Sequence, residues 1–161
     1  MYEEVNGRGH GFPEKGAKPG LEWMAEHVRD PRPTTIHWQP VRSWKTNFYW
    51  IRWDDPWLGC TLSAKVDRST NSIAVTFKAP HAVLSKAAAA ALTKKLPSLS
   101  FHVDDRLLDV SKPIVVTVDG EERFRGVVPA SLATLVRTAE EREDREYVFS
   151  RRLRLGPVDV R

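Results

Sequence analysis

Between residues 114 and 127 the chain reads Ile114-Val115-Val116-Thr117-Val118-Asp119-Gly120-Glu121-Glu122-Arg123-Phe124-Arg125-Gly126-Val127, and this stretch indicates the fold class. Its first five residues are mostly β-branched and predict a strand, and residues 122–127 predict a second strand. Asp119-Gly120 between them is typical of a tight hairpin, because such a turn needs positive φ angles, which glycine adopts freely and aspartate tolerates. The stretch therefore predicts a hairpin in a mainly β domain.

Further strands are predicted on both sides of this hairpin, since β-branched and aromatic residues gather between turn residues. In residues 72–77 the apolar Ile73, Val75 and Phe77 alternate with smaller or polar residues, so one face of that strand is expected to be buried. The other predicted strands are residues 35–38, 48–53, 100–103 and 147–155.

Two helices are expected to interrupt the strands. One is the alanine-rich stretch 82–95, and the other is residues 129–143, with Ser131 as its cap and Leu132, Leu135, Val136 and Ala139 along one face. If the helix extends that far, Glu141 is expected to pair with Arg145 four residues on. Residues 34–161 are thus predicted to form a β-sandwich, fibronectin-like, that carries one or two helices.

Residues 1–30 have a different pattern, in which a short strand at 2–5 is followed by a loop and by a helix at 16–29 that Pro19 opens. Asp30-Pro31-Arg32-Pro33 ends this helix, because a residue before proline is disfavoured in the helical region. We place the domain boundary at this point. Leu21, Met24 and Val28 share one face of the helix, which therefore needs a cover.

The loop of this first segment, Gly7-Arg8-Gly9-His10-Gly11-Phe12-Pro13, holds a histidine among glycines. A histidine that acts as general base must project at the carboxyl end of a strand, within reach of a hydroxyl and a carboxylate. The glycines permit the turn and leave the imidazole uncovered. A histidine in such a loop can equally be an ordinary surface residue, and the loop alone leaves both interpretations open.

The order of strand, Gly-x-Gly-His-Gly-Phe-Pro loop, helix with Trp23 and Met24, and Arg-Asp-Pro-Arg-Pro exit resembles the carboxyl end of bacterial esterases related to polyhydroxybutyrate depolymerases and dienelactone hydrolases. Several of these α/β-hydrolases continue into an extra β-rich domain, to which residues 104–120 are similar. In that superfamily the triad runs Ser, then Asp or Glu, then His. The resemblance implies the role of triad histidine for His10.

The chain departs from this family in one respect that matters for activity. It has no serine in a Gly-x-Ser-x-Gly element, and Cys60 after Gly59 is followed by Thr61-Leu62 instead. A histidine without its nucleophile and its orienting carboxylate is a poor catalyst. We therefore expect no hydrolase activity from this chain alone, and we expect it to be the C-terminal part of a serine esterase or peptidase-like hydrolase.

Size and composition fit one domain with a short appendage. The chain has 161 residues, 41% of them hydrophobic and 29% charged, and one cysteine, so a disulfide framework is not expected. No apolar stretch is typical of a signal peptide or a membrane span, and we expect a soluble chain whose parent protein could be secreted or periplasmic. The net charge is +4, but its basic residues are dispersed, so nucleic acid is not an expected partner.

All six tryptophans fall between residues 23 and 57. Flat aromatic rings can hold sugar faces or polyester chains, which would make Trp53 and Trp57 substrate-binding residues. They can also fill the core and its margins, which is the more common use of such residues. Alternation places Phe48 and Trp50 on one face of the predicted strand 48–53 and Trp53 on the other, which favours packing.

The remaining polar patterns are typical of turns and surfaces. The paired carboxylates at 54–55, 104–105 and 140–141 stand near predicted turns or helix ends, and the five histidines show no metal-ligand spacing. The sequence thus predicts neither a metal nor a cofactor.

Two functions remain in view. The chain is an inactive accessory part of a hydrolase, with a role in packing, substrate contact or assembly, or it is a stand-alone β-sandwich module that binds a glycan or a protein. The first function implies a missing hydrolase domain as the partner of the first helix, and a second copy of the chain is compatible with either function. The following domain, or no partner at all, also remains open for this helix.

Overall fold

The computed structural model describes residues 16–78, 98–142 and 144–156. The chain divides into two units, residues 1–30 and residues 31–161. Three sequence predictions lie outside the described residues: the strand at 2–5, the His10 loop and the alanine-rich helix at 82–95.

Helix α1 spans Lys18–Glu26 in the first unit and is shorter than the predicted helix 16–29. Pro19 stands in its first turn, where a missing N–H leaves no hydrogen bond unmade. Beyond Glu26 the backbone becomes extended, and His27 stacks on Trp23 with 4.0 Å between the ring centroids. No residue of α1 is buried, so its apolar face has no cover among the described residues 16–30.

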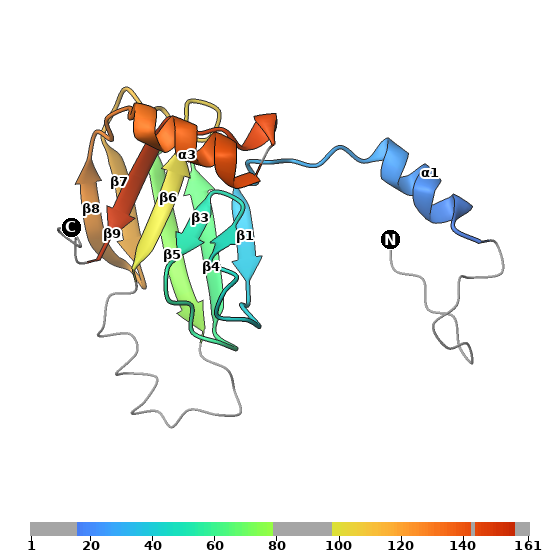
Figure 1. Cartoon of the computed structure of the whole chain (residues 1–161). Coiled ribbons are helices and arrows are strands. Elements are labelled where there is room, and N and C mark those ends of the chain that lie inside the picture. Colours follow the sequence, from blue (N-terminus) through green and yellow to red (C-terminus); the bar gives the residue numbers. More distant parts are fainter. Residues whose placement is uncertain (1–15, 79–97, 143, 157–161) are drawn as a thin grey trace. The chain divides into compact units, whose positions relative to one another are not determined.

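The described part of the second unit is mainly β and contains two sheets (Figure 1). The five-stranded sheet has the order β1-β4-β5-β7-β8, and the four-stranded sheet has the order β2-β3-β6-β9. The pair β5–β7 is parallel, and every other pair is antiparallel. The strands are β1 Thr35–Trp38, β2 Asn47–Phe48, β3 Ile51–Trp53, β4 Thr61–Asp67, β5 Ser72–Lys78, β6 Leu99–Val103, β7 Ile114–Val118, β8 Glu121–Gly126 and β9 Arg151–Leu155.

The predicted hairpin is confirmed. β7 and β8 pair across a two-residue turn in which Asp119 has φ 50° and Gly120 has φ 85°. Both angles lie in the left-handed region that such turns require. Asp119 also joins the turn to the neighbouring strand, because its carboxylate accepts a hydrogen bond of 3.0 Å from the Phe77 amide.

One hydrophobic core is built from both sheets, and it includes Trp50, Trp53 and Phe101, which are completely buried. The Trp50 indole N–H is satisfied by the Pro33 carbonyl at 2.9 Å, so the start of the second unit is held against the core. Burying each large side chain contributes about 1.5–3 kcal/mol. All five residues of β6 are buried, and this strand lies between β3 and β9 in the four-stranded sheet.

Two strand predictions were wrong in detail. The predicted strand 48–53 is a hairpin of β2 and β3, which turns at Tyr49 with φ 49°. The turn interrupts the alternation of side chains between the two faces of a strand, so Trp50 and its neighbour Ile51 are both completely buried. The predicted strand 147–155 begins at Arg151, since the preceding Arg145–Tyr147 form a 3-10 turn, η1, that the Asp144 carboxylate caps.

Helix α3, Leu132–Arg142, begins three residues after the predicted start at 129, directly after the predicted cap Ser131, which accepts a hydrogen bond from the Thr134 amide at 3.3 Å. It lies across the ends of the strands (Figure 1). Its leucine and valine side chains do not pack into the core, for Leu132 is 77% exposed and Val136 is also exposed. Among the described side chains of α3, that of Thr138 is buried.

Candidate functional site

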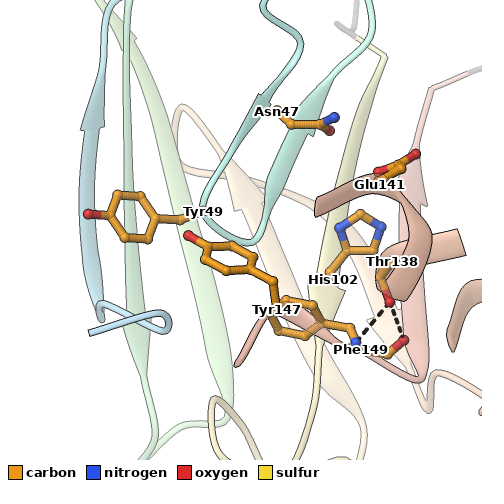
Figure 2. A pocket seen from close by; sticks show the side chains of 7 residues that line it. All are labelled: Asn47, Tyr49, His102, Thr138, Glu141, Tyr147 and Phe149. Carbon is orange, nitrogen blue, oxygen red and sulfur yellow. Dashed lines mark hydrogen bonds between the residues drawn. The ribbon is translucent and has the colours of Figure 1, made fainter. Parts of the chain in front are cut away.

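A small polar pocket lies where α3 and η1 meet the four-stranded sheet (Figure 2). His102 of β6 is buried in its wall and stacks on Phe149, with 5.8 Å between the ring centroids. The pocket is lined by Asn47, Tyr49, His102, Thr138, Glu141, Tyr147 and Phe149. Its interior of about 10 Å³ is what one water molecule needs, and ligand pockets are far larger. The pocket is therefore too small to be a substrate site.

Thr138 holds the two sides of this pocket together. Its hydroxyl oxygen accepts a hydrogen bond of 3.0 Å from the Phe149 amide and lies 3.1 Å from the Phe149 carbonyl, to which it can donate. The amide nitrogen and the carbonyl oxygen of Phe149 are both buried, and leaving a buried polar group without a hydrogen bond costs about 1–3 kcal/mol. The threonine therefore fixes α3 to the chain that leads into β9.

The described residues include one exposed serine–histidine pair, which is not a catalytic arrangement. Ser63 and His37 are directly opposite each other on β4 and β1, with 2.9 Å between the serine oxygen and Nδ1. The pair lies on an open strand surface, and no carboxylate in the described residues is shown to orient the histidine. It is a cross-strand hydrogen bond of the ordinary kind.

Cys60 does not supply a nucleophile either. Its side chain is buried, and burial raises the pKa of the thiol, as does the nearby charge of Asp119. A thiol with a raised pKa stays protonated at neutral pH, and the thiolate is the reactive form.

The two tryptophans predicted as substrate-binding residues take part in packing. Trp53 is 0% exposed and meets the edge of Trp57 with 5.6 Å between ring centroids. Trp57 is half-buried and also packs against Phe77 at 5.5 Å. In this arrangement Trp53 has no ring face open to a ligand. Trp44, in contrast, is exposed.

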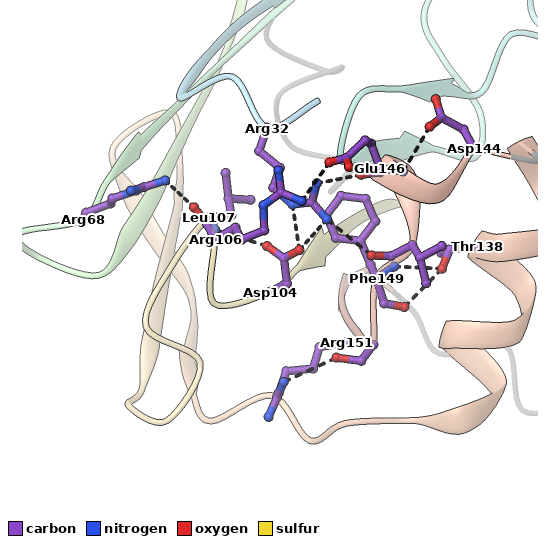
Figure 3. A network of polar contacts seen from close by, with 12 residues as sticks. Arg32, Arg68, Asp104, Arg106, Leu107, Thr138, Asp144, Glu146, Phe149 and Arg151 are labelled. Atoms are coloured by element: carbon purple, nitrogen blue, oxygen red, sulfur yellow. Dashed lines mark hydrogen bonds and ion pairs between the residues drawn. The ribbon is translucent and has the colours of Figure 1, made fainter. Parts of the chain in front are cut away.

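Arg32 is the centre of a network of polar contacts, which includes Asp104 from the paired carboxylates at 104–105 (Figure 3). Arg32 is 6% exposed, and its Nε and Nη2 lie 2.6 Å and 2.5 Å from the same Asp104 oxygen. Its Nη1 donates to the Glu146 carbonyl at 2.6 Å, and the guanidinium lies 4.6 Å from the centre of the Phe149 ring. These contacts join the entry of the second unit to the turn after β6 and to η1, so their role is structural.

The outer face of the four-stranded sheet carries three arginines that the sequence analysis did not bring together, and the charge of a fourth, on α3, acts on one of them. We name Arg52 of β3, Arg152 and Arg154 of β9 and Arg137 of α3 the arginine cluster. Arg52 and Arg154 are both in register with Ser100 of β6, which places them on one row across the sheet. Arg151-Arg152-Leu153-Arg154 is the one sequence signal of this cluster, and β9, which contains it, is an edge strand of the four-stranded sheet.

The members of the arginine cluster differ in their partners. Arg52 binds Asp54 at 2.7 Å and Glu141 at 3.3 Å, so the predicted pairing of Glu141 with Arg145 is replaced by a contact across the fold. Burial raises the pKa of Asp54, but hydrogen bonds from Arg52 and Ser98 outweigh this and hold it below its usual value.

Comparisons with protein-family models, with curated proteins and with solved structures found no match to this chain. Within the described residues, no helix is long and apolar enough to cross a membrane. The same part of the chain contains no group of three histidine, cysteine or acidic residues that could hold a metal ion.

Proposed function

We propose that this chain is a non-catalytic accessory part of a serine hydrolase of the esterase type, in which residues 1–30 complete a hydrolase domain and residues 34–161 form a β-sandwich. The observation that carries the proposal is the uncovered apolar face of α1. Leu21 and Met24, which share one face of α1, are both exposed, and so is Val28 in the extended segment that follows the helix.

A helix of this length is not stable in water by itself, so the apolar face calls for a partner surface. The parallel sheet of an α/β-hydrolase is the surface that the resemblance of the His10 loop implies. The second unit already has a core of its own, and its small polar pocket leaves no room for a substrate. Chemistry would therefore belong to the partner of α1, with His10 as the histidine contributed to it.

We also propose a specific architecture within the mainly β class, which is a β-sandwich. It is supported by the single core to which both sheets contribute. Fibronectin-like domains consist of antiparallel sheets. The parallel pair β5–β7 departs from that pattern, so we propose a mixed sandwich rather than a close copy of the fibronectin arrangement.

The test begins with the genomic DNA before the codon of Met1. We expect the same reading frame, or an adjacent gene, to encode a Gly-x-Ser-x-Gly element. The complete protein should hydrolyse a p-nitrophenyl ester, and His10→Ala should lower its rate by about a thousandfold or more. His27→Ala, which changes a histidine of the same unit that stacks on Trp23, is the matched control and should keep the activity.

The present chain without that element should not hydrolyse the ester. Hydrolysis by this chain alone at a rate abolished by His10→Ala would overturn the proposal. So would the absence of a Gly-x-Ser-x-Gly element from both the reading frame and its neighbours.

The alternative function is a stand-alone β-sandwich module that binds a glycan or a protein through its tryptophan-rich side. One observation favours it, which is that Trp44 is 77% exposed in the loop before β2. Titration with soluble oligosaccharides should then quench tryptophan fluorescence saturably in the wild type and not in Trp44→Ala. Trp23→Ala is the matched control, since Trp23 is also exposed but lies on α1.

A further inference from the structure

Two surface features of the second unit meet at Arg137. The first is a shallow groove on α3, which is lined by Leu132, Ala133, Val136, Arg137 and Glu140. The second is the arginine cluster, in which the charge of Arg137 acts on Arg152 of β9. Glu141, the residue after Glu140 of the groove, contacts Arg52 of β3 at 3.3 Å, so the groove on α3 adjoins the charged face of the sheet.

The arginine cluster holds more positive charge than its own carboxylates neutralise. Asp54 and Glu141 are both engaged by Arg52. Arg152 donates to the Ser100 hydroxyl at 2.9 Å, while its Nε is buried without a hydrogen-bond partner among the described residues. Arg137 and Arg154 are exposed, and neither makes an ion pair with another described residue.

The like charges are unfavourable for the domain by itself. Burial lowers the pKa of the Arg152 guanidinium, and the charges of Arg154, Arg52 and Arg137 lower it further, with Asp54 opposing them. An arrangement of this kind is relieved by an anionic group placed among the arginines, and arginine binds carboxylates and phosphates with two parallel hydrogen bonds.

We infer that α3 and the outer face of β9 form a docking surface for a protein segment that is both apolar and acidic. Leu132 and Val136 would receive the apolar side chains of the segment, and Arg137, Arg152 and Arg154 would bind its carboxylates. Exposed apolar residues next to arginines are the usual composition of a protein interface. This inference goes beyond the proposed function and does not depend on it.

The dimensions of the cluster favour an acidic protein segment over a nucleic acid. Arg52 and Arg154 are separated by one strand, so their Cα atoms are about 10 Å apart, and Arg152 lies one two-residue step, about 7 Å, along β9. Such a patch has room for two or three carboxylates. A nucleic-acid strand needs a longer basic track to follow its phosphates.

Charge also argues against a second copy of the chain on this surface. A symmetric dimer would place the same patch of both copies face to face. The unpaired arginines would then oppose each other, which is unfavourable at an interface.

The probes are two synthetic helical peptides of about four turns, with the same leucine positions and either glutamate or lysine on the polar face. Calorimetric titration of the full chain should show that the glutamate peptide binds, more weakly as salt is added, and that the lysine peptide does not. Arg137→Glu with Arg154→Glu should weaken binding about tenfold or more. Lys65→Glu with Lys78→Glu makes the same charge change on the other sheet and should leave binding unchanged.

Two further variants test the details of the surface. Leu132→Ser should weaken binding, whereas Val41→Ser, which also changes an exposed apolar residue, should not. Glu140→Gln should strengthen binding, because Glu140 is the one carboxylate that lines the groove. All these side chains are exposed, and unchanged thermal unfolding by circular dichroism would establish that the variants fold.

Equal binding of the two peptides, or binding of neither, would overturn the inference. So would tighter binding of a single-stranded oligonucleotide that is lost in Arg137→Glu with Arg154→Glu. A concentration-dependent dimer that is abolished by Leu132→Ser would show that a second copy occupies the surface instead.

Discussion

Replacing Arg32 by methionine should strongly destabilise the second unit. Arg32 is 6% exposed, and its partner Asp104 has a side chain that is 13% exposed, so water reaches neither group freely. Methionine keeps much of the volume but removes the charge and every donor. The Asp104 carboxylate and the carbonyls of Glu146 and Val148, which Arg32 binds at 2.6 Å and 3.3 Å, then lose their partner.

The expected loss is about 3 kcal/mol in the free energy of unfolding, at the lower end of what breaking a buried ion pair costs. The lower end applies because Asp104 keeps the hydrogen bond of 3.1 Å that it accepts from the Leu107 amide. In Asp104→Asn the turn can keep that bond while the charge is removed. The double variant should therefore cost at least about 1 kcal/mol less than the sum of the two single variants.

Urea unfolding followed by tryptophan fluorescence measures these differences, because Trp50 and Trp53 lie in the core. The matched control is Arg106→Met. Arg106 pairs with Glu146 at 2.8 Å in the same network, but both side chains are 56% exposed, so the loss should be much smaller than for Arg32→Met. If Arg32→Met cost no more than Arg106→Met, or if the double variant were additive, the argument from burial would be refuted.

Three further predictions concern single residues. Asn71→Ala should cost about 2–3 kcal/mol in urea unfolding, because the buried amide donates to the Asp109 and Pro113 carbonyls and accepts from the Asp109 amide; a cost below about 1 kcal/mol would contradict this. Thr138→Val should cost about 1–2 kcal/mol and speed hydrogen exchange at the Phe149 amide, whereas an unchanged exchange rate would exclude the proposed clamp. The Asp109 carboxyl should titrate with a pKa of about 2 by NMR, since Lys112 and then Ser111 hydrogen-bond its charged form. Because that pKa is lower than in the unfolded chain, its stabilising effect is present at neutral pH and is lost as the pH falls toward 2, and a midpoint near the usual value of about 3.9 would contradict the interaction.

Local patterns were sufficient for the elements that depend on near neighbours. The hairpin of β7 and β8 follows from Asp119-Gly120, because the turn angles are a property of those two residues. The start of α3 at Ser131 follows in the same way from a hydroxyl that caps the first turn. Strand β4 was missed, although Leu62, Ala64 and Val66 alternate along it and are buried, so its signal was present in the sequence.

The arrangements that the sequence analysis did not predict join residues that are far apart in the chain. Arg32 and Asp104 are 72 positions apart, and Glu141 meets Arg52 across 89 positions. Periodicity says which face of a strand is apolar, but it does not say which strand will lie beside it or in what register. The arginine cluster exists because β3, β6 and β9 align Arg52 and Arg154 on either side of Ser100, and α3 adds Arg137.

The amino-acid pattern was therefore enough to establish the mainly β class, the hairpin turn and the helix cap, since backbone preferences and alternation act over a few residues. The pairing of distant strands, the burial of Arg32 and the convergence of four arginines were decided by the folded chain. Each of them requires the closure of long loops, whose outcome depends on the packing of the whole core rather than on any local stretch.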